Sequence, residues 1–282
     1  MKNMKKILTI TAMVLVTGFV FAQDVPNEPG NFRFGLKITP SINWLKPDGN
    51  IISANGASMK FGGGLIIEYR LAKVVSFQTG LQIDMSGGKV IYNNGVNLST
   101  PNSNSVSYVY NTLDDNIQKY NAPHDSASSA RYQLNSRSYN INYITIPLSF
   151  KLKTKEIGSL TYFGQFGVNN SFRWKATAKD EVQKITASGL GISETKSKVD
   201  VTSDVSLYTA SLNIGLGAEM NLSGSTSLTF GISYLSGFIN VVKNNSDYLE
   251  RKANDANGHP LFTAMPQQIK SNAIVLTVGV LF

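Results

Sequence analysis

Apolar and polar side chains alternate along most of the chain beyond residue 30. Between Asn31 and Leu45 the even positions carry apolar residues such as Phe32, Leu36 and Trp44, whereas the odd positions are mostly polar. A repeat of two residues places successive side chains on opposite faces of a strand. This stretch therefore predicts a long β-strand with one apolar and one polar face.

The same alternation recurs, and it predicts eight long strands in all. They cover residues 31–45, 59–71, 75–85, 139–153, 160–174, 208–220, 228–238 and 274–282. In the fourth strand the apolar residues change parity, from Tyr139, Ile141 and Tyr143 to the even positions that follow. Because a proline cannot donate to a ladder, we expect a β-bulge near Tyr143 or Pro147.

The connectors between these strands alternate between short and long. The short ones are residues 71–74, 154–157 and 222–225, and the long ones are residues 46–57, 87–136, 176–203 and 241–268. This pattern predicts an all-β fold: an eight-stranded antiparallel transmembrane β-barrel with short periplasmic turns, long extracellular loops and both termini on the periplasmic side. A soluble β-sandwich is the alternative, but its strands are usually only about 5 to 6 residues long.

Aromatic residues fit this placement in a membrane. Strands of about 14 residues, tilted by about 45°, rise about 33 Å, which exceeds the apolar band of about 25 Å. Trp44 and Trp174 end outward-running strands in the apolar phase, so we predict that they form an outer aromatic girdle. Phe282 ends the last strand in the lipid-facing phase and is similar to a C-terminal signal for the barrel-assembly machinery.

The first residues have the pattern of an export signal. Three lysines precede an uncharged run from Ile7 to Ala22, and small residues precede Gln23. We predict a signal peptide at 1–22, a short N-terminal periplasmic segment at 23–30 and the barrel domain at 31–282. The protein is thus expected in the bacterial outer membrane.

Composition excludes several classes of function. The formal charge is 26 − 18 = +8, of which three lysines belong to the predicted signal peptide, and the remaining excess is scattered rather than gathered into a nucleic-acid-binding patch. The absence of cysteine excludes disulfides, thiol nucleophiles and an acylated lipoprotein anchor. A charged fraction of 16% fits a sheet whose outer face meets lipid.

Several segments resemble the PorT-like outer-membrane β-barrel family (outer membrane protein beta-barrel domain). They are Phe34-Gly35-Leu36-Lys37, the third strand from Ser76 to Gln82, Tyr143-Ile144-Thr145-Ile146-Pro147-Leu148 followed by Lys151, Gly215 to Ala218, and Gly279 to Phe282. The resemblance covers nearly the whole chain after the signal peptide, although the loop at 87–136 is longer than the family needs. It implies an eight-stranded outer-membrane barrel. It implies function poorly, since the namesake is linked to type IX secretion and a fold does not carry its role.

The polar phase of the strands supplies a lumen network. In an eight-stranded barrel side chains fill the lumen, and charges buried there must satisfy one another. The predicted network comprises Arg33, Lys37, Glu68, Arg70, Asp84, Lys151 and Glu219, with Lys60 and Gln165 in the same phase. We interpret it as a plug that holds the barrel shut, with a gate or narrow solute path as the alternative.

No motif in the sequence requires enzymatic chemistry, a cofactor or a metal. His124-Asp125-Ser126 lie adjacent in the longest loop and His259 lies in another, but neighbours in sequence rarely form a working triad. A lipid-modifying enzyme is therefore the less favoured hypothesis. The prediction is a structural or binding protein, or else an accessory subunit of an envelope secretion complex.

The predicted partners follow from the loops and from the location. Residues 93–135 are rich in Asn, Ser and Tyr, a composition that suits recognition surfaces and equally suits a capping loop. Lysines in the loop at 176–203 are placed to approach the phosphates of lipopolysaccharide. We expect outer-membrane lipid and lipopolysaccharide, the barrel-assembly machinery and an envelope protein as partners.

Overall fold

The computed structural model describes residues 31–48, 52–92, 106–111, 116–118, 129–186, 189–243, 245–254 and 260–282. The predicted signal peptide at 1–22, the predicted periplasmic segment at 23–30, both histidines and much of the longest predicted loop lie outside these residues. Within the described residues, no helix is long and apolar enough to cross a bilayer.

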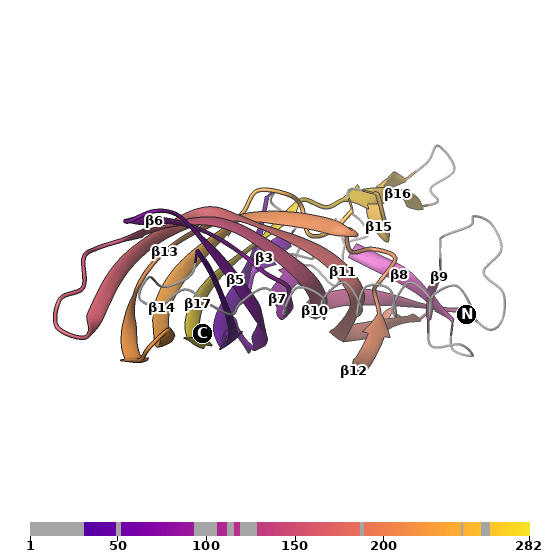
Figure 1. Ribbon diagram of the computed structural model, residues 1–282. Coiled ribbons are helices and arrows are strands. Elements are labelled where there is room, and N and C mark those ends of the chain that lie inside the picture. Colours follow the sequence, from indigo (N-terminus) through magenta and orange to yellow (C-terminus); the bar gives the residue numbers. More distant parts are fainter. Residues whose placement is uncertain are drawn as a thin grey trace, which may run out of the picture. The chain divides into compact units, whose positions relative to one another are not determined.

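All regular structure in the described residues is β-strand (Figure 1). The strands are β1 (Phe32–Ile38), β2 (Ser41–Pro47), β3 (Ile52–Ala54), β4 (Ser58–Lys60), β5 (Gly62–Ala72), β6 (Val75–Thr79), β7 (Gln82–Tyr92), β8 (Val106–Asn111), β9 (Asn116–Gln118), β10 (Ser129–Lys153), β11 (Leu160–Thr186), β12 (Gly189–Asp200), β13 (Tyr208–Ser223), β14 (Thr226–Gly237), β15 (Asn245–Asn254), β16 (Pro260–Pro266) and β17 (Ile269–Leu281).

Within the part of the chain that the structure describes, eight antiparallel strands close into a ring, which confirms the predicted fold class. Its order is β1/β2, β4/β5, β6/β7, β10, β11, β13, β14 and β17, where paired labels mark one strand position interrupted by a short irregularity. The first strand closes the ring, because Lys37 pairs with Gly279 of β17 on one side and with Gly64 of β5 on the other. A closed ring leaves no unpaired sheet edge within the apolar zone.

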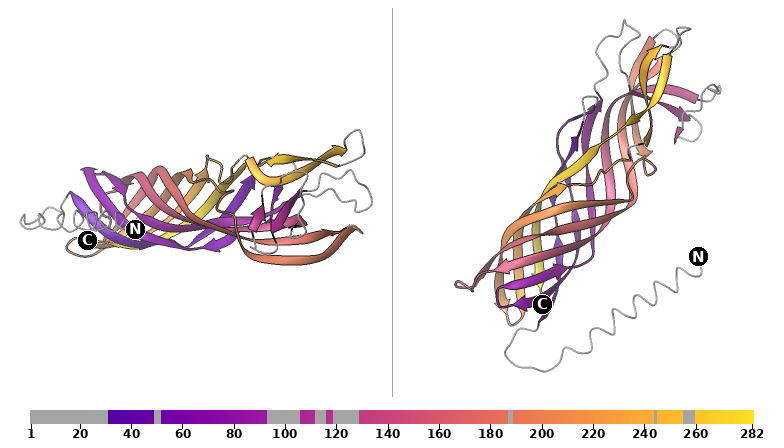
Figure 2. Two further views of the ribbon diagram at one scale, coloured as in Figure 1. Left: turned by 90° about the vertical axis from the view of Figure 1, so that its right-hand side faces the viewer. Right: turned by 90° about the horizontal axis from the view of Figure 1, so that it is seen from above.

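The short turns lie together at one end of the barrel, where β17 also ends (Figure 2). They join β5 to β6, β10 to β11 and β13 to β14, at the predicted positions. We call this the short-turn end and the opposite one the long-loop end.

Strands occupy much of what the sequence predicted as long loops, so this part of the prediction was wrong. β10 has 25 residues and β11 has 27, so both run well beyond the predicted ends of their strands. β12 extends the sheet from β11, and β8 from β10, at the long-loop end (Figure 1). The predicted strands end where apolar residues leave the lipid-facing phase, although the strands themselves continue.

A register shift lies at the predicted place near Tyr143, but its extra residue is on the neighbouring strand, so it does not cause the change of parity in the fourth strand. The pairing of β10 with β7 keeps one register from Ser136 to Thr145, and the same register continues into β6. The register shift near Tyr143 belongs to the β10–β11 ladder, where Trp174 is the extra residue on β11. Pro147 lies where the partner of β10 changes from β7 to β6, so its missing N–H costs no ladder bond there.

Tyr139, Ile141 and Tyr143 therefore share the interior face of β10 with Thr145 and Lys151, and all are buried. What changes along the strand is the polarity of each face. Between Ile144 and Leu152 the outward side chains are apolar, and between Ser138 and Asn142 they are polar. The interior changes in the opposite sense, from polar to apolar.

An apolar belt surrounds the half of the barrel next to the short turns. From Phe32 to Trp44 the belt rises about 28 Å at a tilt of about 45°, close to the height of an outer-membrane apolar band. Its exposed members include Phe34, Leu36, Ile42, Leu65, Leu81, Ile146, Leu148, Phe166, Leu216, Phe230 and Leu276. Apolar side chains outside and polar ones inside are the arrangement of a transmembrane barrel.

Candidate functional site in the barrel interior

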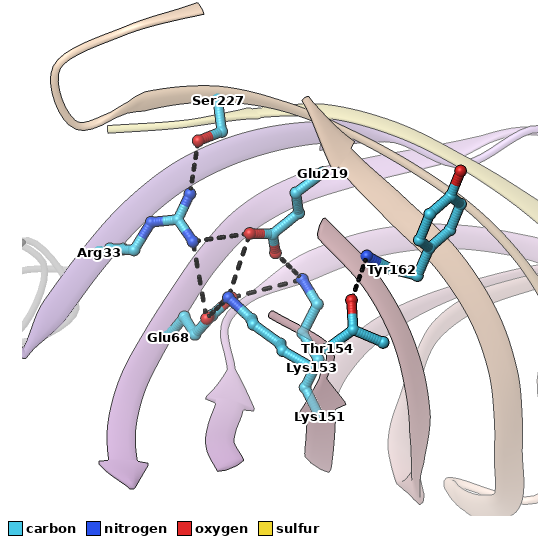
Figure 3. A network of polar contacts seen from close by, with 8 residues as sticks. All are labelled: Arg33, Glu68, Lys151, Lys153, Thr154, Tyr162, Glu219 and Ser227. Atoms are coloured by element: carbon cyan, nitrogen blue, oxygen red, sulfur yellow. Dashed lines mark hydrogen bonds and ion pairs between the residues drawn. The ribbon is translucent and has the colours of Figure 1, made fainter. Parts of the chain in front are cut away.

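Five charged side chains meet inside the barrel near the short-turn end (Figure 3). Arg33 of β1 donates to Glu219 of β13 at 2.8 Å and lies 3.8 Å from Glu68 of β5. Lys151 of β10 contacts both carboxylates, at 3.4 Å from Glu68, and Lys153 also contacts both, at 3.1 Å from Glu219. We call these five residues the ionic cluster.

Strand pairing explains how the cluster assembles. Arg33 and Glu68 lie directly opposite each other in the β1–β5 ladder. Glu219 lies on β13, which is separated from β10 by β11, so its contacts with Lys151 and Lys153 cross the lumen rather than follow one ladder. The cluster therefore ties opposite sides of the wall together.

The ionic cluster is deeply buried and carries three cations against two carboxylates. The side chain of Lys151 is 1% exposed and that of Glu68 is 2% exposed, so each must be satisfied internally. The Lys151 ammonium also lies 3.9 Å from the centre of the Phe163 ring, whose negative face offsets part of the excess positive charge.

Glycines make room for this aromatic ring. A Cβ added at Gly217 would collide with the tip of Phe163, and one at Gly231 would touch it. Gly217 and Gly231 pair with each other on β13 and β14, so the Phe163 ring packs against the part of the wall where neither strand has a side chain. Phe163 thus closes the lumen beside the ionic cluster.

A polar cavity of about 100 Å³ lies in the middle of the lumen. Its wall is made mainly of hydroxyl and carboxamide side chains from β1/β2, β7, β10, β11, β13, β14 and β17, with one lysine and one aspartate. The lining includes Lys37, Thr39, Asn43, Gln82, Asp84, Gln165, Asn169, Asn213, Ser233, Ser271 and Thr277. At about 10–15 Å³ per water centre, such a cavity holds several water molecules.

Four side chains lining this cavity have a buried polar atom with no hydrogen-bond partner in the protein: Thr39, Gln82, Tyr143 and Asn213. Buried groups of this kind are normally satisfied by water or a ligand. The cavity is therefore a hydrated chamber in the lumen.

An apolar core fills the lumen at the long-loop end. It is formed by buried side chains from β2, β3, β7, β10, β11, β12, β17 and the segments at 201–205 and 241–242. Its members include Leu45, Val90, Leu134, Tyr139, Ile141, Ala178, Val201, Val205, Val242 and Ile269. Charged residues thus fill the lumen near the short-turn end, and apolar residues fill it near the long-loop end. The sequence pattern predicts loops for most of these segments and therefore does not predict this core.

A buried ion pair crosses this apolar core. Arg137 of β10 donates to both carboxylate oxygens of Asp180 on β11, at 2.6 and 2.5 Å, and both side chains are 0% exposed. The third nitrogen of the guanidinium, Nη1, lies 3.9 Å from a carboxylate oxygen of Asp204, which follows β12. The pair therefore links β10, β11 and the turn after β12.

The structure places the predicted lumen residues in three groups. Arg33, Glu68, Lys151 and Glu219 meet in the ionic cluster, whereas Lys37 and Asp84 line the chamber higher in the barrel. Arg70 is half-buried on β5 and makes no ion pair within the described residues. The functional interpretation of this network as a plug stays a prediction.

Three charged residues were missed. Lys153 lies at an odd position of the same strand as Lys151, so the alternation alone predicts that it faces the lumen. Arg137 and Asp180 lie in stretches taken as loop or as loop edge, and the parity that Arg137 shares with Tyr139 was their only signal.

The predicted girdle and terminal residues lie on the outer face. Trp174 is 55% exposed, Trp44 is half-buried, and the Trp44 ring lies 6.2 Å from that of Tyr234. Phe282 is exposed, and its backbone pairs with Phe34. Their roles in the interface and in assembly stay predictions. Within the described residues, no group of three or more His, Asp or Glu side chains could hold a metal ion.

Sequence comparison supplies the class of protein. Residues 21–243 match the family described as "Outer membrane protein beta-barrel domain". The chain belongs to this family and is an outer-membrane β-barrel protein. No curated protein matches it in sequence.

Solved structures with similar strand arrangements are remote in sequence. Neisserial surface protein A (NspA) is 10% identical, with a TM-score of 0.37 over 88% of this chain and 95% of that one. Ail of Yersinia pestis, in complex with the heparin analogue sucrose octasulfate, is 10% identical, with a TM-score of 0.34 over 90% and 100%. OprG of Pseudomonas aeruginosa is 11% identical, with a TM-score of 0.41 over 92% and 99%. We therefore assign the fold from the strand pairing within this chain, not from these similar structures.

Proposed function

We propose that this protein is a closed barrel without enzymatic activity, which anchors an extension for structural or binding roles at the cell surface. The extension comprises β8, β12, β15, β16 and the ends of β10 and β11 at the long-loop end. The observation that carries the proposal is that buried side chains fill the lumen near both ends, as the ionic cluster and the apolar core. The chamber between them has a volume of only about 100 Å³. The part left for interaction is the extension at the long-loop end.

Planar-bilayer recording tests this proposal. We expect no steady conductance from the wild-type barrel, and none from Glu68→Gln, because the apolar core still closes the other end. Glu156→Gln, an exposed change in a short turn, is the matched control. Reproducible single-channel steps from the wild-type protein would contradict the closed barrel and favour a narrow solute path.

The proposed orientation places the short turns and both termini in the periplasm, after removal of residues 1–22. The gathering of the short turns at one end supports it, together with the family. Mass spectrometry of the mature N-terminus and protease digestion of intact cells test it. A tag inserted after Lys155, in the short turn between β10 and β11, is expected to resist the protease until the outer membrane is opened.

Membership in the PorT-like branch and a place in a secretion complex form the second proposal. The sequence segments described above support it, especially the Tyr143 to Leu148 stretch. Purification in mild detergent, followed by identification of copurifying envelope proteins, separates an autonomous barrel from a subunit. Recovery of the barrel alone would exclude a stable complex.

Lipopolysaccharide and the barrel-assembly machinery remain proposed partners. The exposed, lipid-facing Phe282 supports recognition by the assembly machinery. A Phe282→Ala variant is expected to accumulate outside the outer membrane, which cell fractionation measures. Normal membrane levels of this variant would exclude Phe282 as the signal.

A further inference from the structure

Two lysines face each other directly across the β2–β17 ladder. Lys46 pairs with Lys270, two positions beyond the pair formed by Trp44 and Asn272. Directly opposed residues point to the same side of a sheet, with Cβ atoms about 5 Å apart, and like charges placed so are destabilising. This pair is therefore a local electrostatic cost that an anion would remove.

Both lysines lie on the outer face of the barrel, just beyond the apolar belt. Ile42 and Ile274, which form a pair in the same ladder and have the same parity, are exposed members of the belt. Lys46 is exposed and Lys270 is half-buried. Two residues along a tilted strand raise the lysines about 5 Å above Trp44, the depth at which lipid headgroups begin.

Aromatic rings fix this depth. The Trp44 and Tyr234 rings lie 6.2 Å apart on β2 and β14, the two strands that flank β17. Asn272 lies between them and is buried. Lys270 is the next outward residue of β17, so the lysine pair lies immediately above an aromatic ledge.

Neither ammonium has a carboxylate partner within the described residues. Asp48 follows β2, where its backbone N–H donates to the Gln268 carbonyl, and its carboxylate forms no ion pair with either lysine. By contrast, Lys89 contacts Glu181 at 3.2 Å, and Lys60 donates to Asn140 at 2.9 Å. Lys46 and Lys270 thus lie close together, at the depth of the lipid headgroups, and without a carboxylate partner within the described residues.

We propose that Lys46 and Lys270 bind the phosphate group of an outer-leaflet lipid, with Trp44 packed against the lipid below it. A phosphate oxygen accepts charge-assisted hydrogen bonds from ammonium groups, and two lysines at one depth match one phosphate. The inference deepens the proposed lipid partnership and rests on the proposed orientation, which places the long-loop end outside. It names the site and the lipid group that the site recognises.

Titration of the full barrel in detergent micelles with bisphosphorylated lipid A tests the site. A Trp174→Phe background leaves Trp44 as the sole tryptophan and as a fluorescent reporter beside the lysines. Replacing both lysines, Lys46→Gln with Lys270→Gln, is expected to weaken binding about tenfold or more. Lys73→Gln with Lys155→Gln, exposed in the short turns, is the matched control and is expected to bind normally.

A charge swap separates binding from folding. Lys270→Glu replaces repulsion with a cross-strand ion pair to Lys46, so the barrel is expected to unfold at no lower urea concentration while lipid A binding is lost. Unchanged binding in this variant or in the double glutamine variant would overturn the proposal.

Two further ligands identify what is recognised. Dephosphorylated lipid A is expected to bind about tenfold more weakly to the wild-type protein, and equal binding would overturn phosphate recognition. Inorganic phosphate at millimolar concentration is expected not to displace lipid A, and displacement would show a site for free phosphate instead. These titrations are independent of the planar-bilayer recording that tests the closed lumen, so either proposal can fail without the other.

Discussion

Two regions of β10 differ in which face is apolar. Next to the short turns, outward residues such as Ile146 and Leu148 are apolar and exposed, while inward residues such as Ser149 and Lys151 are polar and buried. Beyond Tyr143 the outward residues are polar and the inward ones form an apolar core. One continuous strand therefore has a part whose outer face contacts lipid and a part whose outer face contacts water.

The comparison shows that the solvent outside decides which face must be apolar. Because lipid solvates apolar side chains, these side chains are not driven into the lumen. Polar side chains face the lumen instead and form hydrogen bonds and ion pairs with one another. Once the strands leave the lipid, water drives apolar side chains inward as in a soluble protein. The ionic cluster and the apolar core are the two resulting ways to close the same lumen.

The largest effect is expected from the ion pair inside the apolar core. Arg137→Leu leaves the Asp180 carboxylate buried without its bidentate partner, which costs about 4 kcal/mol in the free energy of unfolding. Limited proteolysis and urea unfolding in vesicles measure the loss. Replacing both residues, Arg137→Leu with Asp180→Leu, is expected to restore most of the stability, and equal instability of the double variant would contradict the account.

Truncating one isoleucine in each region comes next. Ile141→Ala opens a cavity in the apolar core and is expected to cost about 3 kcal/mol. Ile146→Ala is expected to cost about 1.5 kcal/mol, because acyl chains refill the lost volume and only the transfer energy is lost. Urea unfolding in vesicles compares them, and equal costs would contradict a core sealed from lipid.

Neutralising one carboxylate of the ionic cluster is expected to cost less than truncating the core. Glu219→Gln leaves the buried Lys151 with only Glu68, but Arg33 and Lys153 retain some contact with water. We expect a loss of about 2 kcal/mol. The same urea titration measures it with Glu156→Gln as control, and a stability unchanged from that control would show that the cluster is not required for the wall.

The smallest effect concerns an exposed pair on the extension. Hydrogen bonds from Ser136 and then from Lys89 hold the pKa of Glu181 below its ordinary value. The stabilisation is complete above the unfolded pKa of about 4.3 and is lost as pH falls through the lower folded pKa. Glu181→Gln is expected to cost about 0.5 kcal/mol at neutral pH, shrinking on acidification. A difference independent of pH would contradict this assignment.

The sequence was sufficient to predict the ring and its short turns, because lipid imposes one unbroken parity on apolar residues. It was not sufficient for the extension, where the outward side chains change from apolar to polar near Tyr143 although the register of β10 with β7 is constant from Ser136 to Thr145. Arg33, Glu68, Lys151 and Glu219 were found by parity, but their meeting across the lumen depends on barrel stagger. The Lys46 and Lys270 pair depends on register between strands far apart in sequence, which no local pattern encodes.

Cysteine scanning along the outward face of β10 tests the change of solvent most directly. The chain contains no cysteine, so each introduced thiol is the only one. In vesicles, the thiols of Asn140→Cys and Asn142→Cys are expected to react rapidly with a membrane-impermeant maleimide, and those of Ile146→Cys and Leu148→Cys to stay unreacted. Equal reactivity at all four positions would contradict a barrel that passes from lipid to water between Asn142 and Ile146.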